Sequence, residues 1–422
     1  MKAFSKKTII NIVLILTLTF IICSKTLALQ HTDKTYLEII ETLSNDSLFG
    51  RSIYNKGKNK ALDFLKSYLK NHSSRSIQFN EFSFDTTFNQ IGSVSLHINN
   101  KLALLEDQFL PSGSSPSCSK STIIHAYTDN HLNKSKLSNL SDIKIKGEFV
   151  LIKKSASNTD KNSVALNEKI SILRYLGAKA IFIETDALLF SPSVNQDLLP
   201  IIWVIPNLIA DSDSIYLELE SKLERYTVTN LLATPLQISF EPALTLMAHY
   251  DHLGTINNSL IYNGANDNAS GVSIAINLFL RSISRTNQIQ LILTDAEEIG
   301  LWGSRTLQES GEFHPISFLI NLDMMGSQTK GLATVGFIED NPMKEKLKFI
   351  ADSLSIPIKF RANTPNSDQY FFLANGIKGF YVYSNEGSQP YHNSRDDFTT
   401  IDYKFLIKSE QFLNHFLLYL GF

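Results

Sequence analysis

The second half of the chain contains four short stretches that are almost continuously apolar: Leu244–Ala248, Gln288–Thr294, Ser317–Leu322 and Gly379–Tyr383. Strands buried on both faces read as continuous apolar runs, whereas strands with one solvated face alternate apolar and polar residues. The four runs therefore predict buried, mainly parallel strands at the centre of a sheet.

Apolar residues recur at helical spacing in the segments around these runs. The pattern predicts helices at 58–72, from residue 272 onward, at 342–355 and at 403–420. The last has a wide apolar face that would suit a membrane surface or packing on the sheet, and we expect packing because it is far commoner. The expected fold class is therefore α/β, a mostly parallel-cored mixed sheet flanked by helices.

The predicted strands end at residues that can bind metal ions. His249 and Asp251 follow the first run. Glu297 and Glu298 follow the second run, and Asp323 follows the third. Because ligands of open α/β sheets bind at the carboxyl ends of the strands, these residues should converge on one crevice.

Asp267 and His392 extend this set. Asp267 lies between Gly264 and Gly271, directly before a helical pattern, which predicts a tight turn at a helix start. His392 lies in the loop after the fourth run and is the obvious second imidazole. Any one of the acids alone would be read as a solvated loop charge, but this combination at strand and helix ends favours one shared site.

A divalent cation would resolve the electrostatic conflict in such a site. Crowded carboxylates repel one another, which raises their pKa values. Imidazole and carboxylate ligands without thiolate suit zinc or a similar borderline ion. One ion cannot use so many ligands, whereas two ions about 3.5–4 Å apart can share a bridging carboxylate. We therefore expect two zinc ions per chain.

Five motifs occur in order along the chain: AHYDHLG, NGANDNASG, DAEEIGLWGS, NLDMMG and YHNSRDD. In this order they resemble the co-catalytic di-zinc aminopeptidases of bacteria, known as secreted zinc exopeptidases. The resemblance implies that His249 and Asp323 hold one zinc ion. It also implies that Glu298 and His392 hold the other, and that Asp267 bridges the two.

The same resemblance implies catalytic roles. Glu297 would be the general base, Asp251 would orient His249, and Tyr391 would either hydrogen-bond the oxyanion or serve only in packing. Asn266 stands where many relatives have a second Asp, which leaves the following bridging residue in place. Another departure is Gln369, which replaces the His of a Ser-Asp-His loop and puts any substrate contact of that loop in doubt.

Residues 1–28 have the pattern of a secretory signal peptide. Lysines at positions 2, 6 and 7 precede the apolar run Ile9–Cys23, and small residues follow at 26–28. The run is too short and too sparsely flanked to predict a transmembrane helix. We expect export to the periplasm or the extracellular space, with a lipid anchor at Cys23 as the alternative.

Charge and cysteine content exclude other classes. The chain has a formal net charge of -2 at pH 7 and no long basic run, so nucleic acid is not an expected partner. Removal of the signal would leave Cys118 as the only cysteine, which excludes an intramolecular disulfide. Membrane contact is expected only through the signal peptide or a lipid anchor, and the oligomeric state does not follow from the sequence.

The catalytic domain is expected to be interrupted by a smaller α/β domain. Residues 29–84, with the sequence LFGRSIYNKG before a helix, resemble the lead-in of the same family and form its N-terminal part. Residues 85–225 form the insertion, and 226–422 form the di-zinc peptidase catalytic domain. Within the insertion, KGEFVLIKK, a helical pattern and LGAKAIFIET predict a βαβ-like unit, which resembles a protease-associated domain.

Taken together, these patterns predict a zinc-dependent exopeptidase that acts on peptides through a metal-activated water. An aminopeptidase is the first expectation. A carboxypeptidase, a glutaminyl cyclase or a deacylase could use the same scaffold. A non-catalytic receptor is less favoured, because such proteins lose ligands that this chain retains.

Overall fold

The computed structural model describes residues 36–127, 145–153, 165–327, 330–336, 342–385, 387 and 390–422. The predicted signal peptide and Cys23 lie outside the described residues. Within the described part of the chain, no helix combines the length and the apolar character needed to cross a membrane.

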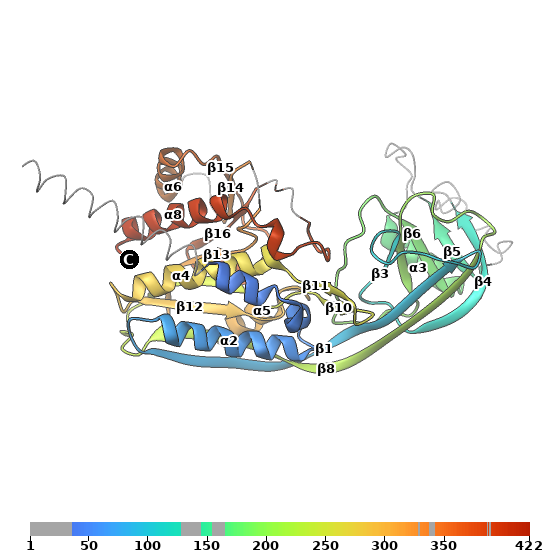
Figure 1. Ribbon diagram of the computed structural model, residues 1–422, viewed down its shortest axis with the longest axis horizontal. Helices are drawn as coiled ribbons and strands as arrows, with labels where there is room; N and C mark the ends of the chain where they lie inside the picture. The colour runs from blue at the N-terminus through green and yellow to red at the C-terminus, as the bar shows by residue number, and fades with distance from the viewer. Residues whose placement is uncertain are drawn as a thin grey trace, which may run out of the picture.

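A mixed sheet forms the centre of the first lobe (Figure 1). Its strands follow one another in space in the order β15 (Ile358–Arg361), β14 (Leu332–Val335), β16 (Gly379–Ser384), β13 (Ile316–Leu322), β9 (Ala243–His249), β12 (Ile289–Thr294) and β8 (Ser214–Pro235). The four strands predicted from the apolar runs are β9, β12, β13 and β16, and they pair in parallel. The flanking strands β8 and β14 pair antiparallel with this group, so the predicted mixed sheet with a parallel centre is confirmed.

Helices cover both faces of this sheet. The longer helices pack on one face: α2 (Lys56–His72), α4 (Gly271–Ile283), α6 (Pro342–Ser353) and α8 (Tyr403–Leu420). The shorter helices α5 (Trp302–Ser310) and α7 (Gln369–Ala374) pack on the other. The apolar face of α8 is buried at Phe412, Leu413 and Phe416, so this helix packs on the sheet as expected.

A long antiparallel ribbon joins the first lobe to a second one (Figure 1). It consists of β1 (Ile77–Ile98) and β8, each 22 residues long. The expected domain limits fall in the middle of the ribbon, where Thr86 pairs with Tyr226. The sequence pattern did not predict that these strands are continuous, because β8 alternates buried and more exposed residues in the second lobe but is buried at every position from Val228 to Pro235 in the first.

The second lobe has a smaller sheet and one described helix. Its members are β2 (Lys101–Leu102), β3 (Phe109–Pro111), β4 (Cys118–Tyr127), β5 (Phe149–Ile152), α3 (Leu166–Tyr175), β6 (Ala180–Glu184) and β7 (Ile201–Val204). Strands β5 and β6 pair in parallel and α3 connects them, which is the βαβ unit that the sequence predicts. A hairpin of the first lobe, β10 (Gly254–Ile256) and β11 (Leu260–Tyr262), packs into the core of the second lobe through Ile256 and Tyr262.

Candidate functional site

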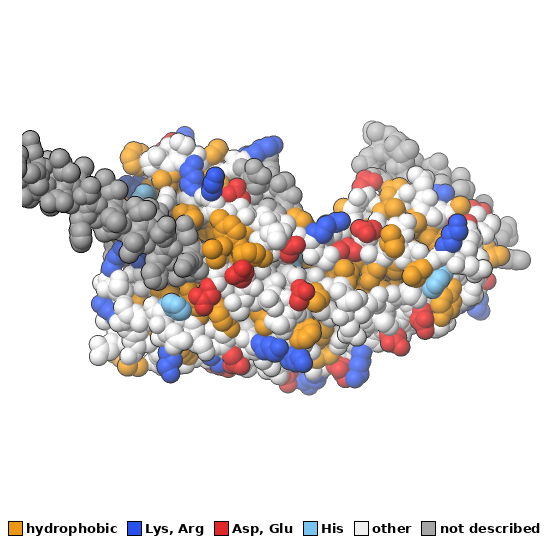
Figure 2. Space-filling view, in the orientation of Figure 1, with side chains coloured by type: hydrophobic (Ala, Val, Ile, Leu, Met, Phe, Trp, Pro, Cys, Tyr) orange, Lys and Arg blue, Asp and Glu red, His pale blue; other side chains and the backbone are white. Residues whose placement is uncertain are grey.

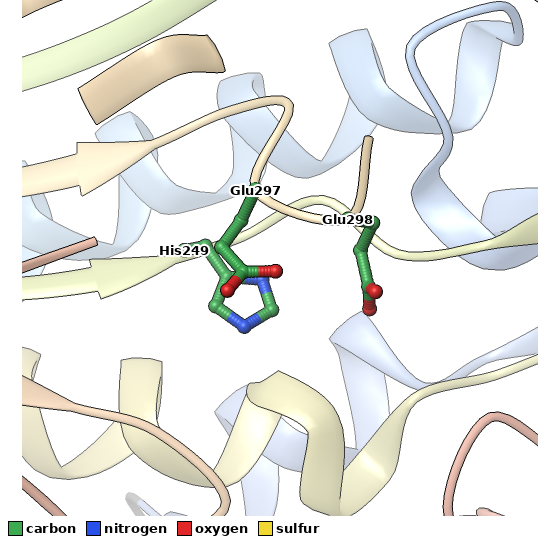
Figure 3. Close-up of side chains that lie close together, drawn as sticks. All are labelled: His249, Glu297 and Glu298. Atoms are coloured by element: carbon green, nitrogen blue, oxygen red, sulfur yellow. The ribbon is translucent and has the colours of Figure 1, made fainter. Parts of the chain in front are cut away.

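The predicted metal ligands converge at the carboxyl ends of β9, β12 and β13. Strand β9 ends at His249, whose ring is fully buried. The turn after β12 carries Glu297 and Glu298, and Asp323 follows β13 directly. Figure 3 shows Glu297 beside the ring of His249, with Glu298 directed into the same space from the next position of the turn.

Asp267 enters the site from a different kind of element. It lies in a short irregular helical turn, η3 (Ala265–Ser270), which leads directly into α4. Gly264 precedes this turn with a φ of 60°. A Cβ atom at Gly264 would lie 2.2 Å from the carbonyl oxygen of Asp267, so only glycine fits there.

The two carboxylate oxygens of Asp267 face two different imidazoles. Oδ1 lies 3.3 Å from Nε2 of His249, and Oδ2 lies 3.6 Å from Nε2 of His392. His249 Nε2 is also 3.3 Å from Oδ1 of Asp323. His392 Nε2 is 2.9 Å from Oε2 of Glu298. The structure therefore brings together two ligand groups, which meet at Asp267.

His252 lies behind Glu298 and also contacts it. Its Nδ1 is 2.6 Å from Oε1 of Glu298, whereas His392 approaches the other oxygen. The side chain is fully buried, and with Asp267 and Glu298 it forms a further group that could hold a metal ion. Strand alternation predicts that His252 turns away from His249, but it does not reveal the contact with Glu298.

Asp251 supports both the imidazole and the glutamate turn. Its Oδ1 lies 3.6 Å from Nδ1 of His249. The backbone N–H groups of Glu297 and Glu298 donate to the same carboxylate at 3.2 and 3.4 Å. One side chain thereby fixes the positions of β9 and the turn after β12 relative to each other.

Burial and neighbouring charges shift the pKa values of the two adjacent glutamates in opposite directions. Burial raises the pKa of Glu297 well above its usual value, with His249 opposing and Glu298 adding to the shift. Burial also acts to raise the pKa of Glu298, but His392 and His252 outweigh it and hold that pKa well below its usual value. Glu298 is therefore the anionic member of the pair, and Glu297 has the greater affinity for a proton.

Tyr391 lies at the rim of the site. Its ring stacks on that of His392, with centroids 3.9 Å apart and planes 21° apart. The side chain is partly exposed, at 44%. Burial and the carboxylates of Asp267 and Glu298 raise the pKa of Tyr391, so the phenol is a hydrogen-bond donor.

The sequence did not single out Asp396, which is fully buried beneath the site. Its carboxylate accepts the backbone N–H groups of Asn266 and Asp267 at 2.8 and 3.0 Å. Asp396 is the last residue but one of the motif YHNSRDD. The motif therefore contained it, but the sequence did not show which atoms it contacts. Asn266, the departure from the usual Asp, accepts from the N–H of Gly326 at 2.9 Å and joins the turn to the loop after Asp323.

Arg51 is a second residue that the sequence analysis missed. It ends the short helix η1 (Asp46–Arg51) and is completely buried. Its guanidinium donates to the carbonyl oxygens of Tyr250 at 2.9 Å and Gly264 at 3.0 Å. Burial lowers the pKa of Arg51 to about 10. The side chain joins the loop after His249 to the turn that carries Asp267.

A buried ion pair supports the start of the glutamate turn. Lys58 Nζ of α2 lies 3.0 Å from Oδ2 of Asp295, and both side chains are almost inaccessible. Asp295 also accepts the N–H of Thr229 on β8 at 2.8 Å. Asp295 therefore joins α2 and β8 to the start of the glutamate turn.

The loop at residues 367–369, in which Gln369 stands where relatives have a His, supports Asp323. Ser367 Oγ donates to Oδ2 of Asp323 at 2.9 Å, and Thr294 donates to Asp368. Gln369 is fully buried and accepts from Asn321 at 3.2 Å. These contacts lie on the buried side of the site, which explains why a His at position 369 is not needed to hold the loop.

Left-handed backbone occurs at or beside three of the site residues. The φ angles are 60° at Ala296, 52° at Met324 and 48° at His392. Such conformations cost non-glycine residues energy and concentrate at functional sites, where the surroundings hold them in place. Here they turn the chain sharply at the ends of β12 and β13 and at the last imidazole.

The donor set fits a metal ion of the zinc type. Groups of histidine and carboxylate ligands have atoms within 4.8 Å of one another, in the sets His249–Asp267–Asp323 and His249–Glu297–Glu298. Buried carboxylates this close need a cation to offset their repulsion. No thiolate takes part, which suits zinc with imidazole and carboxylate ligands.

The structure is thus that of an α/β protein with a candidate metal site at the carboxyl edge of its sheet. Residues 231–417 match the sequence model of Peptidase family M28. No curated protein is similar enough in sequence to count as a match.

Solved structures of bacterial aminopeptidases share the fold over nearly the whole chain. A zinc aminopeptidase from Bacillus subtilis aligns with a TM-score of 0.66 and 18% identity, covering 90% of this chain and 93% of that one. An aminopeptidase from an Aneurinibacillus strain gives 0.64 and 20%, covering 90% and 92%. A peptidase M28 precursor from Shewanella amazonensis gives 0.66 and 17%, covering 93% and 95%. The resemblance to bacterial zinc aminopeptidases is thus confirmed at the level of fold, and the family match supports a peptidase.

Proposed function

We propose that the protein is an aminopeptidase that uses two zinc ions to hydrolyse N-terminal residues from peptides. The observation that carries the proposal is the position of Asp267, whose two oxygens face His249 and His392 separately. A carboxylate between two ligand groups suits a bridging role in a two-metal site. His249 and Asp323 would complete one ion's ligands, and Glu298 and His392 the other's.

When bound, the ions would supply Lewis acidity, which lowers the pKa of a water molecule and polarises the scissile carbonyl. Glu297 is the proposed general base, because its raised pKa and its position beside His249 suit proton transfer. It would accept the proton of the attacking water and return it to the leaving amine. The Tyr391 hydroxyl is the proposed donor to the oxyanion.

Asp251 is proposed as a positioning residue rather than a group that touches substrate. It bonds to the backbone of both glutamates and lies beside His249, so it orients the base and the ligand together. Supporting partners of this kind often matter 10–100-fold for metal affinity or activity, an order-of-magnitude range.

The test is a substrate panel with matched peptides. Peptides with a free amino terminus are compared with the same peptides carrying an N-terminal acetyl group, before and after chelation and after zinc is added back. We expect cleavage only of the free peptides, lost on chelation and restored by zinc. Cleavage of the acetylated peptides from the carboxyl end would instead indicate a carboxypeptidase.

Metal content separates the remaining alternatives. Two zinc ions per chain would support the peptidase, and one would favour a glutaminyl cyclase, which uses a single zinc. No bound metal and no turnover would favour a receptor. Release of an acyl group from a substrate would favour a deacylase.

We further propose that the protein is exported, on the basis of residues 1–28 alone. Anchoring at Cys23 is the alternative. N-terminal sequencing of the secreted or membrane fraction distinguishes the two.

A further inference from the structure

A pocket of about 420 Å³ lies between the two lobes, next to the proposed metal site. The first lobe contributes Pro390, Tyr391, Asn393 and Arg395 to its lining. The second lobe contributes residues of three segments: Glu106 and Asp107, the stretch 186–189, and Ile205. Figure 2 shows that the molecule is hollowed between the lobes and that charged side chains of both signs line the hollow.

Direct hydrogen bonds fix the pocket to the loop that carries His392. The N–H of Phe190 donates to the carbonyl oxygen of His392 at 3.3 Å. The N–H of Ser394 donates to Glu106 Oε1 at 2.7 Å, and the Ser394 hydroxyl donates to its other oxygen. The second lobe is therefore bonded on both sides of Asn393 to the loop that carries His392.

The same segment of the second lobe reaches the other side of the site. After Phe190, Val194 packs against a hydrophobic cluster that contains Ala296 and Ile299, the residues on either side of the two glutamates. The N–H of Asn89 on β1 donates to the carbonyl oxygen of Ser193 at 2.8 Å and holds the segment down. Residues 186–194 thus form a fixed wall from the last imidazole to the segment after Glu298.

The lining combines carboxylates with apolar side chains. Glu106, Asp107 and Asp186 supply three negative charges, and Arg395 supplies one positive charge. Arg395 pairs with Asp107 at 3.6 Å, but both side chains are exposed, at 67% and 62%, so the pair is weak and can exchange. Leu188, Leu189 and Tyr391 supply apolar surface in the same pocket.

We propose that this pocket is a subsite for a lysine or arginine side chain of the substrate peptide. Such a side chain has an apolar stem and a cationic end, which matches apolar walls that lead to carboxylates. The proposal rests on the proposed peptidase function, because the pocket adjoins Tyr391 and His392, where the scissile bond would lie. Acidic side chains are disfavoured here by the net negative lining.

The experiment compares peptides that differ in one charge. Lysine is placed at the first or the second position of an otherwise neutral peptide, and each peptide is matched with one carrying Nε-acetyl-lysine. The zinc-loaded enzyme should prefer lysine over acetyl-lysine at one of the two positions by about fivefold in kcat/KM, the size expected for one or two exposed charge pairs. Which position responds identifies the residue that enters the pocket.

Variants test whether the pocket causes the preference for lysine over acetyl-lysine. The double variant Asp107→Asn with Asp186→Asn should bring the lysine to acetyl-lysine ratio close to one, and Arg395→Gln should raise it. The control is Glu218→Gln, an exposed carboxylate on β8 of the same lobe but outside the pocket, which should leave the ratio unchanged. Calorimetric binding of the same peptide pairs provides a readout that does not need turnover.

The two proposals fail in different ways. Equal kcat/KM and equal binding for lysine and acetyl-lysine at both positions would overturn the subsite, while cleavage of the neutral peptides would still support the peptidase. A preference that persists in the double variant would also overturn it. Charge-selective binding without any turnover would instead contradict the peptidase and support the pocket.

Discussion

Asp396 holds Asp267 by its backbone: one carboxylate oxygen accepts the N–H of Asp267 and the other that of Asn266. The two residues are 129 positions apart in the chain. Asp396 also lies close in sequence to His392, so the loop that delivers the last imidazole also fixes Asp267, the proposed bridging carboxylate.

The substitution Asp396→Asn should therefore weaken metal binding without removing any ligand. The amide would place a donor opposite a backbone donor, which displaces the turn around Asp267. Loss of a supporting partner typically lowers metal affinity about 10–100-fold. Competition with a fluorescent zinc chelator measures this. The matched control is Asp397→Asn at the half-buried neighbour, whose side chain caps the short helix η4 (Phe398–Thr400); asparagine can cap there as well. Equal metal affinity of the two variants would contradict the role of Asp396.

Removal of metal should lower stability and activity together. The bound ions offset repulsion among buried carboxylates, so chelation leaves those groups uncompensated. Thermal unfolding followed with and without chelator should give a lower Tm for the metal-free protein. Among single ligand substitutions, Asp267→Asn should lose the most metal because its oxygens face both histidines. An Asp267→Asn protein with two tightly bound ions and normal turnover would rule out the bridging role.

The adjacent glutamates should respond differently to the same change. Glu297→Gln keeps the size of the side chain but removes the basic site, and loss of a general base costs about 10²–10⁴-fold in rate. Its metal content should stay the same. Glu298→Gln should release one ion, and excess zinc should restore part of its activity. Measuring kcat and bound zinc for both variants tests the assignment, and the opposite pattern would reverse the two roles.

Lys58 should matter for folding although it lies outside the ligand set. Lys58→Met leaves Asp295 buried without its cation, and breaking a buried pair on one side costs about 3–5 kcal/mol. Urea unfolding of the zinc-loaded protein measures the loss. The control is Lys60→Met on the exposed side of the same helix, which should cost little. The double variant Lys58→Met with Asp295→Asn should recover part of the loss, and its failure to do so would mean that the pair is not coupled.

The sequence predicted which residues come together at the site better than it predicted which residues hold them in place. His249, Glu298 and Asp323 follow apolar runs, so their shared edge could be inferred from the strand rule alone. Arg51 and Asp396 bond to backbone atoms of distant loops, and no periodicity encodes such contacts. The long ribbon was missed for a related reason, since its two strands are buried differently in the two lobes. That residues 85–225 are a protease-associated domain stays a prediction.

The ribbon has a consequence for how copies of the protein behave toward one another. Among the described strands, β1 pairs on one side with β8 along its length and otherwise only with the two-residue β2. Over residues 77–87 the edge of β1 away from β8 pairs with no described strand, whereas Asn89 and Gly92 further along bond to Ser193 and Asn257. An unpaired strand edge is a template on which a second chain can add a strand. Acidic residues at Glu81 and Asp85 and the irregular register at Ile91/Ser93 work against such addition. Replacing both acids with valine should therefore produce concentration-dependent association in sedimentation experiments, while the residues of the candidate metal site stay unchanged.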